Sequence, residues 1–461
     1  MFTNSLFLEN INKFLYRIQN SSAGVYARDS LLFCHIDFLC WIFFILTIFS
    51  TCCLSSGTIG AFALIFCGLN IFKMLFKKGE SIKISGLDVI LILYFLFVIV
   101  SLFGSSLFIL SLKGFLKNVV YFLFYFSSVY FFLNNKKKIL PTVLFIAVIM
   151  SYESIVAVFQ HFNRVEALAG WVDTSSMTSE SQLLSRSFGT LNPSNPNLLG
   201  GYLITGLSSI FAYFAINYLK RDKRRTLLFA GLLALNVVAI IFTGCRGAYL
   251  GLIAFFLVFA WCINHYVKAV FGGFRNIKKR YKNLLAGILA IGIAAIILTP
   301  SISRRFVSIF HFRGDSSISF RMNVYEAAWH MFQDNPFLGI GLGNLNFREI
   351  YGLYMKTGFD ALGSYCVPLE IAVESGIFAL LLFALFITCA IVKAFKIFLN
   401  SDTPRNAKVI IFAVILAIIS TMAHGLFDTV WYRPQLQIIF WINIAVLNTY
   451  MLSTNLKLVK R

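Results

Sequence analysis

Long apolar runs fill most of the chain and limit what it can fold into. Twelve of them have roughly the 20 residues that a helix needs to cross the hydrocarbon core of a membrane. Hydrophobic residues make up 59% of the 461 residues and charged residues 13%, with a mean hydropathy of +0.80, which excludes a water-soluble domain with one core. We therefore predict an all-α, polytopic membrane helix bundle. The predicted helices are residues 31–52, 57–76, 84–105, 115–133, 139–160, 197–218, 226–243, 247–266, 284–300, 367–392, 409–427 and 435–453.

The basic residues predict how the bundle is oriented. With a cytoplasmic N-terminus, 28 of the 40 Lys and Arg residues fall on the cytoplasmic side and 12 on the outer side, as the positive-inside rule requires. Both chain ends are then expected in the cytoplasm. A net charge of +21 could also suggest nucleic acid, but here Lys and Arg punctuate apolar runs and do not cluster on a folded face. No nucleic-acid partner is therefore expected.

The N-terminal residues predict no cleaved signal peptide, and the cysteines predict no disulfide framework or bound metal. About thirty mixed residues precede the first apolar run without a short charged, apolar and cleavage pattern, so we expect no removable signal peptide. The nine cysteines show no metal-ligand spacing, so neither a disulfide framework nor a metal site is expected. Six of them fall in apolar runs, namely Cys34, Cys40, Cys52, Cys53, Cys67 and Cys389.

Two long outer segments are where we expect function to concentrate. The whole chain, residues 1–461, is predicted to form a single membrane domain. Residues 161–196 form the first long outer loop, and residues 301–366 form a larger, partly helical outer cap between the ninth and tenth helices. Short loops between membrane helices offer little room for chemistry, whereas long ones carry binding residues.

Arg246 is an unexpected cation between two apolar runs, in the stretch FTGCRGAYLGLIAFF at residues 242–256. The predicted orientation puts it on the outer side, where the positive-inside rule asks for no positive charge. An arginine at the edge of the hydrocarbon layer marks either a boundary, where its side chain snorkels to the headgroups, or a functional site. Both interpretations remain open for Arg246 at this point.

The large outer segment contains a predicted amphipathic helix, ISFRMNVYEAAWHMFQ at residues 318–333. Its apolar residues recur at helical spacing, which is typical of a helix lying on a membrane surface. The same pattern would also fit a helix that packs the segment onto the bundle. The predicted apolar face consists of Ile318, Met322, Tyr325, Trp329 and Phe332.

A glycine-rich stretch follows, DNPFLGIGLGNLNFREI at residues 334–350. Its glycines lead into a predicted short helix beginning near Asn344, and free backbone N–H groups at such a helix start can bind an anion. Arg348 would add positive charge in the first turn. The spacing is not that of a dinucleotide-binding fingerprint, and the glycines could instead allow tight helix packing.

The first long outer loop adds a fourth arginine, Arg186, ahead of an Asn- and Pro-rich turn. Asn195, Pro196 and Asn197 are explained as the cap of the following helix, whereas Arg186 has no such explanation. A guanidinium group is the side chain best suited to bidentate contacts with phosphate. The predicted substrate-binding residues on the outer side are therefore Arg186, Arg246, Arg321 and Arg348.

These stretches, taken in order, resemble the O-antigen ligase and polymerase superfamily. The motifs are RSFGTLNPSNPNLLGGYL, TGCRGAYLGL, RMNVYEAAWHMFQDNPFLGIGLGN and LEIAVESGIFALLLF, over roughly residues 180–395. The resemblance implies transfer of a glycan from a polyprenyl diphosphate donor to an acceptor glycan or lipid, at the outer face of a bacterial inner membrane. It further implies inverting chemistry without a metal or other cofactor, and a role for Arg246 on the donor diphosphate, with Arg186 and Arg321 assisting.

The expected general base is where this sequence departs from the ligases. They usually carry a histidine followed by asparagine before the LE..VE.G stretch, whereas this chain has Tyr365 and Cys366 in GSYCVPLEIAVESG. A tyrosine, with an unperturbed pKa of about 10, is a poor base at neutral pH. This stretch and AHGLFDTVWYRPQLQ at residues 423–437 look closest to a cyanobacterial branch once proposed to transport inorganic carbon. Bicarbonate transport therefore stays open as an alternative function, although few ionisable residues are predicted at mid-membrane.

Other outer residues could replace the missing histidine as the base. His424 and Asp428 are four residues apart and could pair on one helix face, where bracing the WYRPQ stretch is the favoured interpretation. The candidates besides Tyr365 are Glu349, Asp360, His311, His330, Glu370 and His424.

Overall fold

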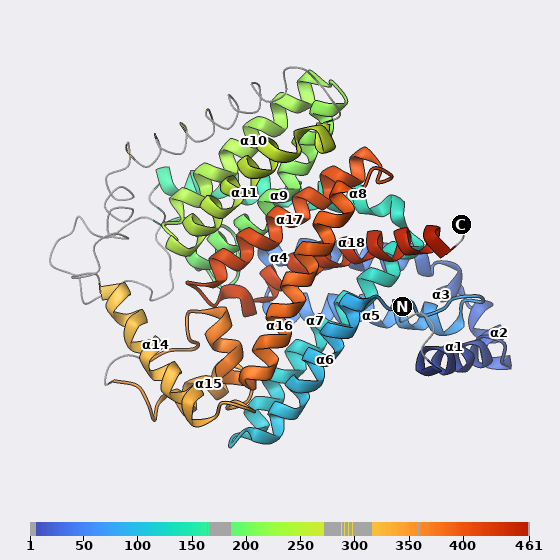
Figure 1. Ribbon diagram of the computed structural model, residues 1–461, viewed down its shortest axis with the longest axis horizontal. Coiled ribbons are helices and arrows are strands. Elements are labelled where there is room, and N and C mark those ends of the chain that lie inside the picture. The colour runs from blue at the N-terminus through green and yellow to red at the C-terminus, as the bar shows by residue number, and fades with distance from the viewer. Residues whose placement is uncertain are drawn as a thin grey trace.

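The computed structural model is a bundle of long helices (Figure 1). It describes residues 6–163, 165, 186–271, 316–356 and 360–459, together with four isolated positions between 287 and 297. Every regular element within these ranges is a helix, so the predicted all-α class is confirmed.

Eleven of the described helices are long and apolar enough to cross a membrane, and each coincides with one of the predicted runs. The predicted ninth helix, residues 284–300, lies outside the described residues apart from the four isolated positions. The eleven helices are α4 (Ile36–Cys53), α5 (Ser56–Phe76), α6 (Gly86–Ser101), α7 (Phe108–Asn134), α8 (Ile139–Phe162), α9 (Pro196–Leu219), α10 (Lys223–Phe242), α11 (Arg246–Phe271), α16 (Val367–Leu399), α17 (Arg405–Gly425) and α18 (Pro434–Val459).

Helix α9 lies at the centre of the bundle. Its apolar window is 94% buried inside the protein, compared with 33% for α6 at the periphery, yet its mean hydropathy is lower, at 1.6 against 2.6. A peripheral helix must be apolar because it faces lipid, whereas a central helix can carry small polar residues whose hydroxyl groups bond within the bundle. Thr205 does so, since it donates to the Gly201 carbonyl and contacts Thr421 of α17.

Two short N-terminal helices were not predicted, α1 (Leu6–Gln19) and α2 (Ser22–Arg28). They are too short or too mixed in composition to register as membrane runs. A third, α3 (Leu31–Cys34), lies within the predicted run 31–52, which the structure divides at His35 into α3 and α4. Polar side chains fix α1 and α2 to the end of α5, because Gln19 donates to the Met74 carbonyl at 3.2 Å and Arg28 donates to the Phe76 carbonyl at 2.9 Å. Both chain ends lie at one end of the bundle, opposite α14 and α15 (Figure 1).

The described part of the outer cap consists of α14 (Ser316–Asp334) and α15 (Asn344–Tyr351), which confirms the predicted helix start at Asn344. The buried face of α14 differs from the prediction. Two alanines, a valine and a methionine form it and pack against α16, while Met322 and Trp329 of the predicted apolar face are 59% and 50% exposed. The buried residues of α14 are Val324, Ala327, Ala328 and Met331.

A break in α16 joins the cap to the membrane domain. Gly376 has φ 80°, and a Cβ atom there would lie 2.0 Å from the Phe337 carbonyl oxygen, so only glycine fits. The break frees two carbonyl groups of α16, and the amides of Ile340 and Gly341 donate to them at 2.9 and 3.0 Å. These backbone bonds hold the glycine-rich stretch against the helix.

The orientation of the bundle in the membrane remains a prediction that cysteine labelling can check. In a background without the native exposed Cys34, single cysteines at Lys137 or Arg224 should resist a membrane-impermeant maleimide added from outside. A cysteine at Glu326, which is exposed on α14, should react under the same conditions. Labelling of either intracellular position from outside would reverse the proposed topology.

Candidate functional site

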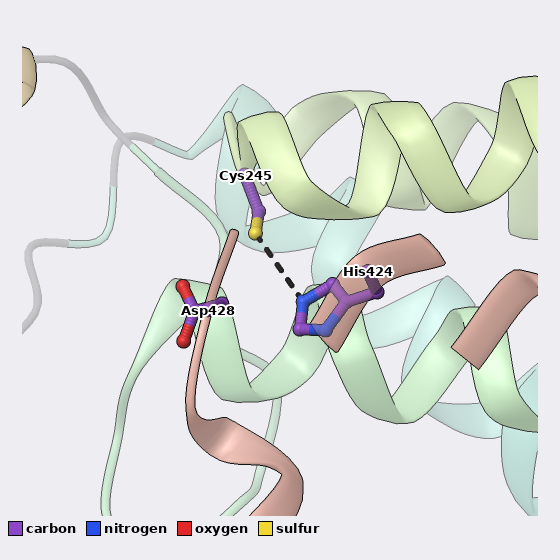
Figure 2. Close-up of side chains that lie close together, drawn as sticks. All are labelled: Cys245, His424 and Asp428. Carbon is purple, nitrogen blue, oxygen red and sulfur yellow. Dashed lines mark hydrogen bonds between the residues drawn. The ribbon is translucent and has the colours of Figure 1, made fainter. Parts of the chain in front are cut away.

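The ends of α9, α11 and α17 that are predicted to face outward meet around a buried thiol, imidazole and carboxylate. Cys245 immediately precedes α11, His424 ends α17, and Asp428 lies just beyond it (Figure 2). The Cys245 Sγ and His424 Nε2 atoms are 3.8 Å apart. One ligand-type atom of each residue lies within 4.8 Å of the others, and all three residues are buried.

Two glycines make room for the His424 ring. A Cβ atom on Gly201 of α9 would lie 3.0 Å from His424 Cε1, and one on Gly247 of α11 would lie 3.3 Å from His424 Cδ2. The ring is therefore held between two helices with its Nε2 atom toward Cys245. Gly247, which follows Arg246, therefore permits the close approach of this histidine.

Arg321 reaches this cluster from the outer cap. Its Nη2 atom donates to Asp428 Oδ2 at 3.4 Å, and its guanidinium group lies 5.6 Å from the centre of the Tyr365 ring. Asp428 is held from the other side by the Val430 amide, which donates to Oδ1 at 3.2 Å. The Arg321 side chain is 16% exposed and that of Asp428 3%, so this ion pair is largely shielded from water.

Arg186 reaches the same place from the first outer loop. Its Nε atom donates to the Thr243 carbonyl at 2.8 Å, and its Nη2 atom donates to Asn197 Oδ1 at 2.6 Å. Asn195 caps α9 as predicted. The contacts give Arg186 the structural explanation that the sequence lacked, because it ties the start of α9 to the end of α10.

The charged groups around Cys245 affect the pKa of its thiol. Burial and, to a smaller extent, the nearby Asp428 carboxylate raise the pKa of the Cys245 thiol to about 11, while Arg186 and Arg321 oppose the shift. Both arginines therefore lie within electrostatic range of one thiol. Arg246 is the next residue and is half-buried at the first turn of α11. We call this group the arginine site; it comprises Arg186, Arg246 and Arg321 together with Cys245, His424 and Asp428.

The arginine site suits an anion better than a metal cation. Cysteine, histidine and aspartate are common metal ligands, but a thiol must lose its proton to bind a metal, and its raised pKa opposes that. Arg321 already occupies one oxygen of Asp428. Among the described residues of this site, three guanidinium groups stand against one carboxylate, and such an excess of positive charge favours a group such as phosphate.

Tyr365 forms a wall of the site but is poorly suited as a base. Burial raises the pKa of its hydroxyl to about 12, and the nearby Asp428 carboxylate adds to the shift while Arg321 opposes it. The residue is held at φ 54°, an uncommon conformation for a non-glycine residue, and its carbonyl accepts a bond from the Tyr325 hydroxyl at 3.2 Å. A neutral phenol can donate a hydrogen bond at neutral pH but cannot accept a proton there efficiently.

The glycine-rich stretch does not provide the predicted anion site. Its amides already have protein partners: Leu342 donates to Ser111 Oγ at 2.9 Å and Gly343 to Glu374 Oε1 at 2.8 Å, in addition to the two bonds to α16. Arg348 likewise forms a bidentate ion pair with Asp360 at the exposed surface. The prediction of Arg348 as a substrate ligand is therefore not supported, because its guanidinium fork is already occupied by a carboxylate.

The remaining candidate bases are not gathered at the arginine site. His330 is exposed and bonds Gln333 at 3.1 Å, and Glu349 is exposed on α15. The Glu370 carboxylate is buried and accepts from the Ser364 amide at 2.8 Å, so it braces the turn before Tyr365. His311 lies outside the described residues. Of the predicted bases that the structure describes, His424 and Tyr365 line the arginine site. Asp428, which was not among the predicted bases, lies beside them.

Comparison with known proteins gives one family match and one relative. Residues 229–384 match the family model described as O-antigen ligase. The chain is also 25% identical over 232 residues to the teichuronic acid biosynthesis protein TuaE of Bacillus subtilis (strain 168). The two matches support the resemblance to the O-antigen ligase and polymerase superfamily. The match to TuaE covers 47% of this chain and 44% of that protein, so the chain matches less than half of its relative's length.

The region matched to the family model overlaps the motifs that carry the resemblance, and the chain is a multi-pass membrane protein. The residues matched to the O-antigen ligase family contain Arg246 and Arg321, whereas Arg186, His424 and Asp428 lie outside that range. Neither comparison favours the inorganic-carbon alternative.

Proposed function

We propose that this protein transfers a glycan from a polyprenyl-diphosphate donor to an acceptor hydroxyl at the outer face of the membrane. One observation carries the proposal. Arg186 and Arg321 both lie within electrostatic range of Cys245, Arg321 contacts Asp428, and Arg246 is the residue that follows Cys245. These arginines come from three segments far apart in the chain. Arg186 also ties the start of α9 to the end of α10, but that tie does not require Arg246 and Arg321 beside it in one largely buried place.

The arginines would bind and stabilise the leaving group. In the transfer, the acceptor oxygen attacks the anomeric carbon of the donor glycan, the bond from that carbon to the diphosphate oxygen breaks, and polyprenyl diphosphate leaves. Negative charge grows on the departing diphosphate. Guanidinium groups that are already in place stabilise this charge without having to reorganise during the reaction.

Asp428 is our choice for the group that takes the acceptor proton. It is the described carboxylate in contact with Arg321, and their separation of 3.4 Å is long for a charge-assisted bond. A bound diphosphate would compete for Arg321 and leave the Asp428 carboxylate available to the acceptor hydroxyl. Tyr365 would donate a hydrogen bond, and His424 would position the site through Cys245.

Expression in a bacterial host, with profiling of its surface glycans, tests the proposed function. We expect a glycan to become attached to a new acceptor at the cell surface, with release of polyprenyl diphosphate by membranes containing the protein. Arg246→Ala should abolish both signals at an unchanged level of membrane insertion. Accumulation of bicarbonate in proteoliposomes, with no turnover of lipid diphosphate, would support transport instead.

A further inference from the structure

One face of helix α8 lies along the part of the first outer loop that carries Arg186, residues 186–190, which we call the Arg186 segment. Three residues of α8 bond to it, namely Glu153, Ala157 and Gln160. Their spacing of four and then three residues places them on the same side of the helix, over about two turns. This face of α8 therefore follows the segment along its length.

Gln160 makes the largest number of these bonds. Its Oε1 atom accepts from the amides of Phe188 at 3.0 Å and Gly189 at 2.8 Å, and its Nε2 atom donates to the Gly189 carbonyl at 2.9 Å. One side chain thus satisfies three backbone groups of a segment that lies outside any helix. Gln160 is only 9% exposed, so water is poorly placed to replace these bonds.

The other two α8 residues hold the segment on either side of the Gln160 contacts. The Ser187 hydroxyl donates to the Ala157 carbonyl at 2.6 Å. The Thr190 amide donates to Glu153 Oε2 at 3.0 Å, and the Thr190 hydroxyl also contacts that carboxyl group. A Cβ atom on Gly189 would lie 2.2 Å from Glu153 Oε2, which shows how closely the backbone approaches α8. Every residue of the segment after the first is therefore bound to this helix.

Arg186 is that first residue, and its side chain reaches the arginine site. The next amide, that of Ser187, donates to the Phe242 carbonyl at 3.1 Å, and the Arg186 side chain donates to the Thr243 carbonyl at 2.8 Å. The backbone beside Arg186 is thus held by α8 on one side and by the end of α10 on the other. These contacts fix the point from which the guanidinium group extends.

We propose that Gln160 is a positioning residue, which holds the Arg186 segment so that Arg186 can contact the diphosphate of the lipid-linked donor. The proposal rests on the proposed function, since it concerns how one of the donor-binding arginines is placed. Gln160 acts through the backbone and not on the donor itself. A displacement of about 1 Å is enough to weaken such a contact, because a guanidinium fork and a phosphate must be aligned.

Hydrogen exchange on the full-length protein in nanodiscs tests the hold on the segment. The Phe188 and Gly189 amides should exchange slowly, although they lie outside any helix. Gln160→Met keeps a side chain of similar length but loses all three bonds, so exchange at both amides should rise about tenfold or more. Amides of α15, which packs against α7 and α14, should be unchanged. Unchanged exchange at Phe188 and Gly189 would overturn the proposal.

A double-mutant cycle shows whether Gln160 acts through Arg186. The probe is fluorescent farnesyl diphosphate, and its equilibrium affinity is measured in the same nanodiscs, which requires no turnover. Arg186→Ala should weaken binding at least about tenfold, the loss expected for a hydrogen bond to a charged group. Gln160→Met should weaken it by a comparable factor. The double variant should match Arg186→Ala within about twofold, because the group that Gln160 positions is already absent.

Additive losses would contradict this role. If Gln160→Met weakens binding as much in the Arg186→Ala background as in the wild type, Gln160 acts independently of Arg186. A general folding defect would give the same additive result, so the cycle excludes it as well.

Two further variants serve as controls. A protonated glutamate side chain offers the same donor and acceptor groups as glutamine, so Gln160→Glu should retain more affinity than Gln160→Met. Gln437→Met removes another buried glutamine, which bonds Trp441 within α18, and should leave the affinity unchanged. Equal losses in Gln160→Met and Gln437→Met would reject a specific role for Gln160.

The outcomes distinguish this inference from the proposed function. If the cycle is non-additive but no glycan transfer can be found, the positioning role of Gln160 stands and the proposed reaction fails. If glycan transfer is found but the cycle is additive, the reaction stands and the positioning role is rejected.

Discussion

Asp428→Asn is expected to lower the rate of glycan transfer by about 10²- to 10⁴-fold, the range typical for the loss of a general base. Binding of the lipid diphosphate should be kept or strengthened. The asparagine Oδ1 can still accept the Val430 amide, but the variant loses the charge that holds Arg321, which becomes free for the ligand. Single-turnover rates with a fluorescent polyprenyl-diphosphate glycan, measured beside its equilibrium affinity, check both parts.

The separation of rate from affinity protects this prediction from a folding artefact. A misfolded protein would lose both quantities, whereas loss of a proton acceptor removes the rate alone. Asp428→Glu restores a carboxylate on a longer side chain and should recover part of the rate. If Asp428→Asn transfers glycan at half the wild-type rate or more, Asp428 is not the proton acceptor, and His424 becomes the residue to test.

Arg246→Lys is expected to reduce transfer about a hundredfold, equivalent to on the order of 3 kcal/mol of lost charge stabilisation. Lysine keeps the positive charge but lacks the planar fork that makes two parallel bonds to a phosphate. An arginine that only snorkels to the headgroups would tolerate the same change, since charge and length are all it needs. Transfer rate and donor affinity should both fall, because the contact is made to the donor itself.

Arg348→Lys is the matched control for this substitution. Arg348 is also an outer arginine, but it is exposed and paired with Asp360, so its replacement should change transfer by less than about twofold. Both variants should insert into the membrane at the wild-type level. Normal transfer by a well-expressed Arg246→Lys protein would return Arg246 to the role of a membrane-edge anchor. A large loss in Arg348→Lys would show that the assay responds to any outer arginine.

The membrane helices could be predicted from the sequence because their cause is local, although some of their ends differ: α7 begins at Phe108 and α16 ends at Leu399, where 115 and 392 were predicted. A helix exposed to lipid must hide its own backbone polar groups and present apolar side chains along its full length, and both demands are met within about 20 consecutive residues. The same holds for the cap at Asn195 and the start of α15 at Asn344. The order of the arginine motifs pointed to the superfamily for a similar reason, because each motif is a short continuous stretch.

The composition of the site was decided only by the tertiary structure. Apolar periodicity shows that a helix lies in the membrane, but not which neighbour it meets, since lipid and protein offer similar apolar surroundings. The sequence could not show that Cys245 would contact a histidine 179 residues away, or that Arg321 would pair with Asp428. Nor could it show that α16 would break at Gly376. The carbonyl groups freed by this break accept hydrogen bonds from amides of the glycine-rich stretch, which had suggested an anion site. Each of these contacts depends on the direction of side chains across a helix interface, which is set when the helices pack together.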